Sequence, residues 1–544
     1  MSIPDTYAEQ LYVVESADKG RSLYTKTLIT PGTIIAADTL YLSSIDESHV
    51  SQYCSTCYTL IERKLCCSMC KQKYYCSIEC QRKQWRSYHW LECYCIRQIP
   101  PPNDSQCHSS MVLLLLQLIL EQIQRHSIED IQITDELQSF TQLCSHVDSI
   151  NDQAQSQYDL IDYSDMVNIV YSMITALLTA IKQSKQGERN KQLSPTMREK
   201  LMNFDEEFIE SSLIDKSKLL YDLNRLHCNV WTMYTSNDLQ AYGYGLSLLF
   251  ALINHSCVPN TVLQFNGSTV TLRAIATIQP NTELSYTYID LINNTENRRY
   301  KLQSQYSFLC KCIRCETSET PAGQLIEYQL NNYICANTTS THDRQCTGYL
   351  VETADPMQLQ CTSCKQYQSY SAVRKLSSEA TLLHDQSSEA YEHNDIKQAI
   401  TLIKLAIKYM IQCVSQYNIT LHKMSNELGN YLNIQESYVE LLPVLLSQLY
   451  CKQLCLSHTP NHIQLGLQYT TIGDIAFELQ YKQLAIQYYT LARDILKVTH
   501  GVEHQLYKDV SLKLTGWNTA TAGISNNNKI DTTNIATCLK YVLH

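Results

Sequence analysis

The chain has 544 residues, of which 44% are hydrophobic and 18% are charged, so it can bury several cores and is too long for one compact domain. Its net charge of -10 and its pI near 5.9 argue against a protein that coats nucleic acid over its whole surface. Most of the 24 cysteines fall in metal-type clusters. We see no leader and no apolar run near twenty residues, which predicts a soluble protein in a reducing compartment.

The first predicted elements are strands. Residues 11–42 alternate apolar and polar side chains on either side of Pro31-Gly32, a pattern that indicates strands joined by a turn.

Eight candidate metal ligands follow, in pairs separated by two or three residues. They are Cys54, Cys57, Cys67, Cys70, Cys76, Cys80, His89 and Cys93. Eight thiolate and imidazole donors complete two tetrahedral zinc sites. Interleaving of the pairs predicts one site from Cys54, Cys57, Cys76 and Cys80, and another from Cys67, Cys70, His89 and Cys93. Cys66, next to Cys67, is an alternative ligand that would shift this register by one. Disulfides are the alternative to zinc, and a reducing compartment disfavours them.

The second half of this segment resembles a MYND zinc finger. The matching residues are Tyr75, Cys76, Ser77, Cys80, Gln81, Trp85, His89 and Cys93. The resemblance implies a partner, either a short proline-containing peptide or DNA. The finger is locally basic, through Arg63, Lys64, Lys71, Lys73, Arg82, Lys83 and Arg86. An ordinary solvated face is the alternative to a binding surface.

Helices and then strands are predicted after the Pro-rich break at Pro100–Pro102. Residues 108–235 show apolar residues at helical spacing, interrupted by a polar stretch, Lys185–Lys200, that we expect to be an exposed loop. Residues 242–288 return to short strands, with an Asn266-Gly267 turn that predicts a hairpin.

Two segments of this later region carry a second resemblance. Asn254-His255-Ser256-Cys257 and the stretch from Glu283 to Asp290 together resemble the catalytic signature of SET-domain lysine methyltransferases. The post-SET motif of those enzymes is matched by Cys310, Cys312 and Cys315. The resemblance implies a third zinc ion with Cys257 as its fourth ligand.

The order of the parts is similar to that of the SET-and-MYND-domain family, in which the finger is inserted within the SET domain. Lys19 to Ile35 resembles the family's glycine turn and strand pair, and Ala492 to His504 resembles its last helices. The implied fold is a multidomain α+β protein: a β-rich SET fold with an inserted MYND finger and a helical insertion, a post-SET zinc site and a C-terminal α-helical TPR-like domain. The expected domains are 1–50 (SET N-terminal part), 51–97 (MYND finger), 98–235 (helical insertion), 236–300 (SET core), 301–318 (post-SET motif), 319–372 (zinc ribbon), 373–518 (TPR-like domain) and 519–544 (tail).

Four cysteines beyond the post-SET motif predict a fourth, ribbon-like zinc site: Cys335, Cys346, Cys361 and Cys364. The alternatives are that His342 replaces one of them, or that they are free thiols. From Ser377 to Val510, small and aromatic residues at helical spacing suit stacked hairpins of tetratricopeptide type, with a plain helical bundle as the alternative.

The SET resemblance also implies roles for single residues. The cofactor would be S-adenosylmethionine, contacted by Gly20, Arg21, Ser22, Asn229, Asn254, His255, Tyr288 and Phe308. Tyr288 would be the catalytic tyrosine that orients the lysine amine, and Trp231 and Phe308 would wall the lysine channel. A polar side chain such as Asn254 in an apolar segment also needs a reason to be buried.

Two departures from the family pattern bear on activity. Ser22 stands where a second glycine is usual, and a side chain there would crowd the cofactor or conflict with a positive φ. Ala251 stands where relatives often have serine.

The predicted function is transfer of methyl groups to the ε-amine of protein lysines, histone or non-histone, by a monomer that is cytoplasmic and nuclear and does not enter membranes. One alternative is a SET scaffold that recruits protein partners through the finger and the helical C-terminal domain. Another is a zinc-dependent DNA-binding regulator whose contacts would include Lys71 and Lys73.

Overall fold

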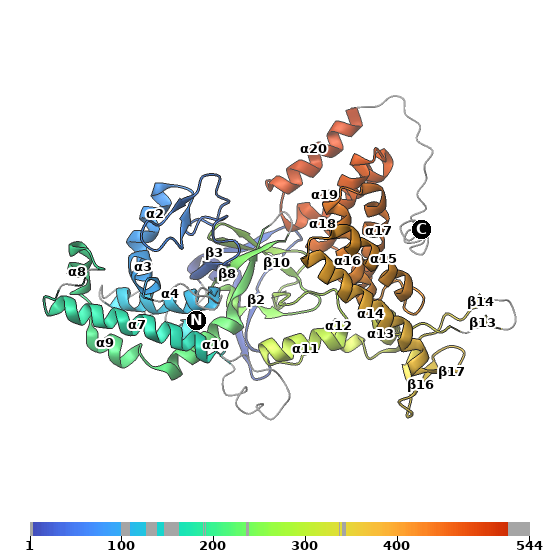
Figure 1. Ribbon diagram of the computed structural model, residues 1–544, viewed down its shortest axis with the longest axis horizontal. Coiled ribbons are helices and arrows are strands. Elements are labelled where there is room, and N and C mark those ends of the chain that lie inside the picture. The colour runs from blue at the N-terminus through green and yellow to red at the C-terminus, as the bar shows by residue number, and fades with distance from the viewer. Residues whose placement is uncertain are drawn as a thin grey trace.

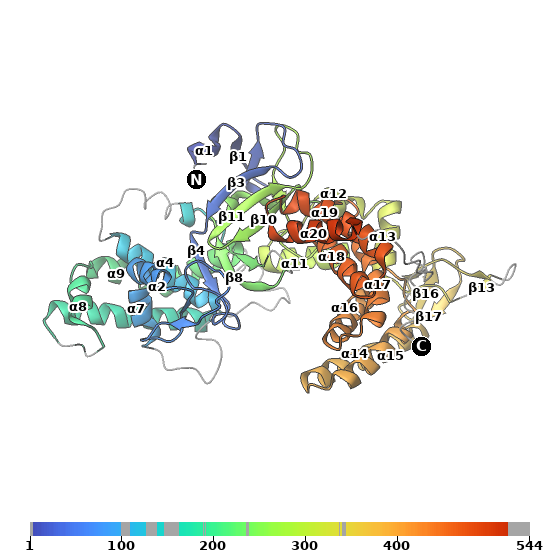
Figure 2. The same ribbon diagram turned by 90° about the horizontal axis from the view of Figure 1, so that it is seen from above.

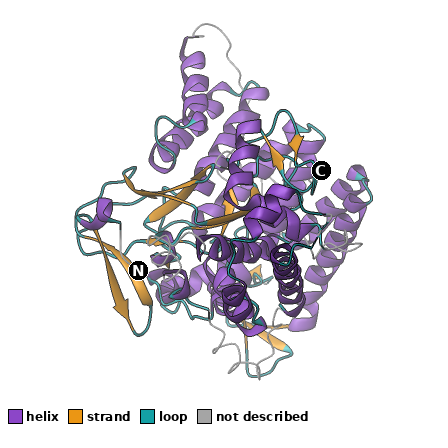
Figure 3. Ribbon diagram, turned by 90° about the vertical axis from the view of Figure 1, so that its left-hand side faces the viewer, coloured by secondary structure: helices purple, strands orange, loops and turns teal. Residues whose placement is uncertain are grey.

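The computed structural model describes residues 4–98, 109–126, 139–145, 163–188, 190, 192–235, 239–336, 338–339 and 344–519. The break at Pro100–Pro102, His342 and the tail expected at 519–544, apart from its first residue, lie outside these residues. The strands of residues 11–45 and 231–286 occupy the middle of the molecule, with the finger and helical insertion on one side and the C-terminal helices on the other (Figure 1). Helices predominate over strands, which form short sheets (Figure 3). The α+β class predicted from the sequence is confirmed.

The central sheets join strands that lie far apart in the sequence. β3 (Ile34–Thr39) and β10 (Thr261–Asn266) flank β11 (Thr269–Ala274), while β4 (Leu42–Ile45) and β7 (Trp231–Tyr234) flank β8 (Ala241–Leu246). The chain therefore leaves the β-rich core after β4 and returns to it at β7. Everything between these strands is an insertion, as the order of motifs predicted.

The predicted hairpin is present, with a small change of register. Asn266 pairs with Thr269 across the β10–β11 ladder, so the turn residues are Gly267 and Ser268 rather than Asn266 and Gly267. Gly267 has a φ of +63°, and a Cβ there would lie 2.6 Å from the carbonyl oxygen of Cys57. Glycine is needed both for the turn and for the close approach of the finger.

Two further strand pairs shape the site. The first pair is the hairpin of β1 (Leu11–Ser16) and β2 (Gly20–Thr25), which follows α1 (Asp5–Ala8). The second pair is parallel and joins β9 (Asn254–His255) to β12 (Ser285–Tyr286). A short 3₁₀ turn at Phe250–Leu252 precedes β9. Leu23, Leu252 and Leu284 are at most 1% exposed in the core beneath them. Burial of these side chains fixes the strands on which the motif residues lie.

The finger consists of a short hairpin and a helical run. β5 (Leu65–Cys66) pairs with β6 (Tyr74–Tyr75), and α2 (Ile78–Gln84), a π-helical turn at Trp85–His89 and α3 (Trp90–Ile96) follow without a break. The hydroxyl of Ser77 accepts a hydrogen bond from the backbone N–H of Cys80 and caps the first turn of α2.

The helical insertion comprises α4 (Ser110–His126), α7 (Ser164–Lys185), α8 (Pro195–Leu201), α9 (Glu206–Ser212) and α10 (Lys216–Asn229). The loop predicted at Lys185–Lys200 was only partly right, because α8 begins at Pro195 behind a Ser194 N-cap. That pairing of a capping serine with proline at the first helical position starts helices readily.

α7 also corrects the expectation that no apolar run approaches membrane-spanning length. By length and composition alone this helix could cross a bilayer. In the structure Val170, Ile174, Leu177 and Ile181 are buried in the core that α7 shares with α4 and α10. The apolar face of α7 is thus covered by its neighbours.

α11 (Thr295–Tyr306), α12 (Ile313–Thr317) and α13 (Pro321–Asn331) lead from the SET core to a small ribbon. The ribbon contains β13 (Thr338–Thr339), β14 (Arg344–Gln345), β15 (Leu350–Glu352), β16 (Gln358–Cys361) and β17 (Tyr367–Ser369). The C-terminal helices are α14 (Tyr370–Glu392), α15 (Ile396–Met410), α16 (Ile419–Ile434), α17 (Tyr438–Cys455), α18 (Ile463–Glu478), α19 (Lys482–Thr499) and α20 (Gln505–Thr519).

Consecutive C-terminal helices pack as hairpins, with α14 against α15, α16 against α17 and α18 against α19 (Figure 2). A Cβ at Gly473 would lie 2.6 Å from the ring of Tyr489, so a small residue faces a large one where α18 meets α19. The helices dock on the β-rich core through Arg273, whose guanidinium donates to the carbonyls of Gly32 and His500. Just before α18, the side-chain amide of Asn461 donates to the carbonyl of Ile275, so the start of α18 also lies against the β-rich core.

Candidate active site and metal centres

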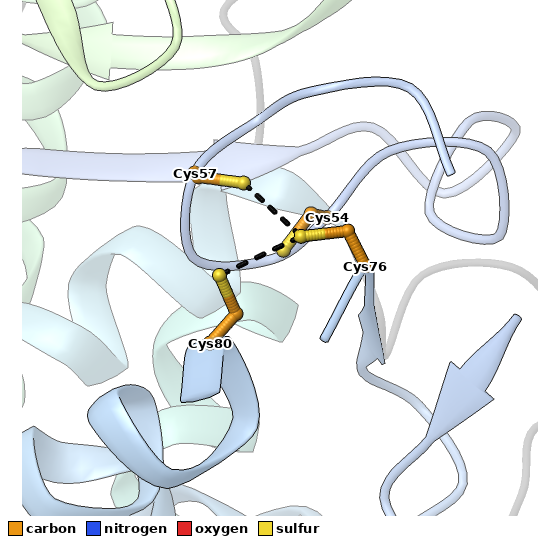
Figure 4. Close-up of side chains that lie close together, drawn as sticks. All are labelled: Cys54, Cys57, Cys76 and Cys80. Atoms are coloured by element: carbon orange, nitrogen blue, oxygen red, sulfur yellow. Dashed lines mark hydrogen bonds between the residues drawn. The ribbon is translucent and has the colours of Figure 1, made fainter. Parts of the chain in front are cut away.

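The first predicted zinc site of the finger is assembled as expected. The ligand atoms of Cys54, Cys57, Cys76 and Cys80 all lie within 4.8 Å of one another, and the Sγ of Cys76 is 3.5 Å from that of Cys57 and 3.6 Å from that of Cys80 (Figure 4). Thiolates at about 2.3 Å from a tetrahedral zinc stand about 3.8 Å apart. The spacing fits zinc and is far too long for a disulfide.

The second site gathers Cys67, Cys70, His89 and Cys93, all buried. Cys66, which could have shifted the register, is exposed and outside the cluster. The Nε2 of His89 faces Cys70 at 3.7 Å, and its Nδ1 lies 2.7 Å from Glu92. This orientation leaves Nε2 free to bind the metal.

Glu92 is a site residue that sequence reasoning missed. Burial would raise the pKa of its carboxyl, but the charge of Lys73 at 2.9 Å and the hydrogen bond with His89 lower it to about 2. Lys73 is only 7% exposed, so it does not belong to the basic surface predicted for the finger. A glutamate three residues after a ligand histidine, on the same helical run, was the available signal.

The post-SET site unites Cys257 with Cys310, Cys312 and Cys315, and the Sγ atoms of Cys257 and Cys315 lie 3.7 Å apart. Arg298, which is 0% exposed, points its Nε at Cys257 at 3.3 Å and its Nη2 at Cys315 at 3.6 Å. Four thiolates around a divalent ion leave a net charge of −2, which the guanidinium partly offsets. Sequence reasoning did not identify Arg298.

The fourth cluster is formed by Cys335, Cys346, Cys361 and Cys364. Cys335 lies 3.7 Å from Cys364, and Cys346 lies 3.6 Å from Cys361. The backbone N–H groups of Ser363 and Cys364 point at the sulfur of Cys361, an arrangement that stabilises a thiolate. The donor set fits a fourth zinc ion.

The Asn-His motif lies at the meeting point of three segments. The side-chain amide of Asn254 donates to the Oγ of Ser22 at 2.7 Å and to Oε1 of Glu283 at 2.9 Å. Glu283 also forms an ion pair with Lys19 at 2.8 Å. The hairpin that carries Gly20, whose φ is +65°, is thereby fastened to β9.

The predicted backbone conflict at Ser22 does not arise. Ser22 lies within β2, opposite Val14, and is not among the residues with positive φ. Its side chain is 3% exposed and serves as an acceptor for Asn254. Ala251 packs against the core of the helical insertion, where a methyl group is suitable.

Arg21 offers a donor to a bound group. Its Nη2 donates to the carbonyl of Gln142 at 2.6 Å, whereas its Nη1 is buried without a partner among the described residues. A buried guanidinium nitrogen of this kind requires an acceptor. The carboxylate of an amino acid fits that need.

Asn229 is held by backbone groups. Its amide donates to the carbonyls of Cys144 at 2.9 Å and Arg225 at 2.7 Å. The segment 139–145 therefore contacts both Arg21 and Asn229. Nothing in its sequence indicated this position.

His255 connects the motif to the post-SET metal site. Its Nδ1 accepts the backbone N–H of Tyr288 at 3.0 Å, and its Nε2 lies 3.3 Å from the Sγ of Cys257. Burial lowers the pKa of His255 to about 4, so the ring is neutral near pH 7 and carries its proton on Nε2, directed at the thiolate.

Aromatic rings surround Tyr288. Their centroids lie 4.9 Å away for Tyr286, 4.8 Å for Tyr306, 5.4 Å for His255 and 6.4 Å for Phe308. The hydroxyl of Tyr288 donates to the carbonyl of Ile253 at 2.7 Å. Burial raises its pKa well above the usual value, which keeps this phenol protonated.

A cavity of about 950 Å³ opens beside these rings. Trp231, Tyr286, Tyr288 and Tyr306 line it on the SET side, and residues of α18 and its N-cap line the other. The indole N–H of Trp231 donates to the hydroxyl of Tyr286. Phe308 is not among the lining residues and instead lies against His255, with ring centroids 6.2 Å apart.

The comparisons with known proteins agree with this geometry. A model of the SET domain matches residues 20–289. The chain is 25% identical over 500 residues to histone-lysine N-methyltransferase ASHR1 of Arabidopsis thaliana, covering 91% of this chain and 93% of that protein. It is 24% identical over 508 residues to histone-lysine N-methyltransferase SMYD3 of Homo sapiens, covering 92% and 95% of the two chains. N-lysine methyltransferase SMYD2 of Mus musculus is 25% identical over 304 residues, which is 56% of this chain and 60% of that protein.

Proposed function

Because residues 20–289 match a model of the SET domain, and because the chain is similar over most of its length to proteins named histone-lysine N-methyltransferases, we propose that it transfers methyl groups from S-adenosylmethionine to the ε-amine of protein lysines. The observation that carries the proposal is the aromatic cavity, whose lining includes Tyr288 next to the Asn254-His255 motif. Histone and non-histone lysines both fit this proposal.

The cavity prepares a lysine side chain for reaction. An amine attacks only when neutral, and its unperturbed pKa is about 10.4. Walls made of Trp231, Tyr286 and Tyr306 disfavour the ammonium form by desolvation and align the amine in one direction. Alignment of reacting groups is worth about 7–11 kcal/mol in favourable cases.

Tyr288 is proposed as the catalytic residue, acting by orientation rather than as a base. Its pKa is raised by burial, so the phenol does not ionise near neutral pH. The hydroxyl donates to the carbonyl of Ile253, and its oxygen lone pairs remain available to an incoming N–H.

The cofactor would supply an electrophilic sulfonium methyl group. We propose that Gly20, Arg21 and Ser22 hold its amino-acid end, where Nη1 of Arg21 lacks a partner among the described residues. Asn254 and His255 would border its central part, with Phe308 beside His255. Asn229 would act through the segment 139–145 that it fastens.

For the partners, we propose a lysine-containing protein as substrate and a short proline-containing peptide as ligand of the finger, with the chain monomeric and both cytoplasmic and nuclear. Relatives named histone-lysine N-methyltransferases support the nuclear part. DNA contact is the weaker alternative, because Lys73 is bound to Glu92 in the interior of the finger.

Calorimetric titration of the zinc-loaded protein with S-adenosylmethionine, together with a labelled methyl-transfer assay on histones, tests the proposal. Tyr288→Phe should retain cofactor binding and lose most methyl transfer, whereas His255→Ala should lose binding. Tyr391→Phe, at a tyrosine stacked on Tyr431 in the helical domain, is the matched control and should change neither. A folded protein that binds no cofactor would refute the enzyme and favour the scaffold.

A further inference from the structure

A second cavity, of about 440 Å³, adjoins the aromatic cavity. It lies between residues 290–301 of the SET side and helices α16, α17 and α18 of the C-terminal domain. Asp290, Lys301 and Gln464 line both cavities. A peptide whose lysine occupies the first cavity can therefore reach the second.

The second cavity is positively charged. Three lysines line it, Lys301, Lys423 and Lys452, against a single carboxylate, that of Asp290. Asp290 is already an acceptor for the N–H of Ile292 and the amide of Gln464. Within the described part of the chain, none of the three lysines has a salt-bridge partner within 4.0 Å, so their combined charge is not neutralised internally.

One buried donor in the wall, on His422, lacks an acceptor. The Nε2 of His422 interacts with the side-chain amide of Asn426 at 3.2 Å, which places the ring proton on Nδ1. That Nδ1 is buried without a partner among the described residues, on a side chain only 6% exposed. An unsatisfied buried donor costs stability unless something binds to it.

Lys452 is a second group in the wall of this cavity with hydrogen-bond donors to spare. Its Nζ donates to Gln468 at 2.5 Å, which uses one of its three hydrogens. Burial lowers its pKa to about 8, because the ammonium is poorly compensated by its surroundings. An anion in the cavity would supply the missing compensation.

We propose that this second cavity binds an anionic side chain of the protein substrate, a carboxylate or a phosphate, located a few residues from the lysine that enters the first cavity. The inference rests on the proposed methyltransferase function and adds a substrate class to it: lysines with an acidic or phosphorylated neighbour. Oε1 of Gln464, buried without a partner among the described residues between the two cavities, is available to a peptide N–H.

The test uses synthetic peptide libraries with a central lysine and one flanking position fixed in turn as glutamine, glutamate or phosphoserine. Binding to the full-length, zinc-loaded protein is measured by fluorescence anisotropy, and methyl transfer is measured in parallel. At the preferred position, glutamate or phosphoserine should bind at least about fivefold more tightly than glutamine, as hydrogen bonds to charged groups predict. Comparing the glutamate library with the phosphoserine library identifies whether the second cavity prefers a carboxylate or a phosphate.

Substitutions of single lysines test whether the second cavity causes the preference for acidic peptides. Lys423→Met, at the exposed rim, and Lys452→Met should abolish the preference while leaving the affinity for the glutamine library unchanged. Lys408→Met, at an exposed lysine of α15 outside both cavities, should leave the preference intact. The rim variant keeps the test valid even if the interior variant fails to fold.

The outcomes separate the two proposals. Equal binding of all libraries, or a preference that survives Lys423→Met, overturns the anion site and leaves the methyltransferase function standing. An acidic preference that depends on Lys423, without methyl transfer to any library or histone, supports the anion site and refutes the enzyme.

Discussion

The hydroxyl of Ser22 accepts a 2.7 Å hydrogen bond from the side-chain amide of Asn254, across 232 positions of sequence. A residue that departs from the usual glycine thus orients the asparagine of the Asn-His motif. Ser22 is therefore part of the site in this protein.

Replacing Ser22 with alanine tests this role. The change leaves the Asn254 amide with one fewer acceptor, and we expect a loss of about 1 kcal/mol in the free energy of unfolding and several-fold weaker binding of S-adenosylmethionine. Ser22→Thr, which keeps the hydroxyl, should restore binding relative to alanine. Denaturant titration and calorimetry measure the two effects, and tighter cofactor binding by the alanine variant would show that the hydroxyl obstructs the site.

Arg298 should be required for the post-SET metal. Arg298→Met leaves the thiolates of Cys257 and Cys315 without their buried cation, so we expect zinc content to fall by one ion per chain and stability to fall by about 3 kcal/mol or more. Arg298→Lys keeps the charge but loses the forked geometry of the guanidinium. Its zinc content and stability should lie between those of the parent protein and those of Arg298→Met. Metal analysis after dialysis against a weak chelator gives the stoichiometry. Unchanged zinc content in Arg298→Met would remove Arg298 from the site.

The ribbon cluster makes a separate prediction about metal content. Cys364→Ser should lower the zinc content from four ions to three, because the fourth cluster loses a ligand. The matched control is Cys66→Ser, at an exposed cysteine outside all four clusters, which should retain four. Methyl transfer should continue in both variants, since neither cysteine lines the aromatic cavity or the second cavity. Equal zinc content in Cys364→Ser and the parent protein would favour free thiols in the ribbon.

His462 should make stability depend on pH. Burial lowers its pKa to about 4, and its neutral Nδ1 caps α18 by accepting the N–H of Gln464. Above pH about 6.5 the ring is neutral in both the folded and the unfolded chain; between pH about 6.5 and about 4 only the unfolded chain binds the proton. Stability should therefore fall as the pH falls through this range, by on the order of 3 kcal/mol from this group.

His462→Asn keeps an N-cap acceptor and removes the titrating ring. Denaturant midpoints measured from pH 7 to pH 5 should decline less steeply in this variant than in the parent protein. Parallel curves would mean that His462 does not contribute to the dependence.

The finger ligands, the hairpin after Asn266 and the C-terminal helices could all be predicted from the sequence, because each depends on residues close together in the chain. Pairs such as Cys54-Cys57 and Cys67-Cys70 form local knuckles whose chemistry is set by spacing. The start of α8 at Pro195 was missed even though its signals were local, because the polar composition of the stretch outweighed them.

The contacts of Ser22 with Asn254, of Arg298 with Cys257 and Cys315, and of Lys73 with Glu92 were decided only by the tertiary structure. Ser22 and Asn254 meet because β2 and β9 pack on one core, and no sequence pattern spans the insertions that separate them. The same is true of the second cavity, whose lysines come from α11, α16 and α17. Sequence spacing determines which residues can act together on one element, whereas packing of distant elements determines which charges and donors finally share a site.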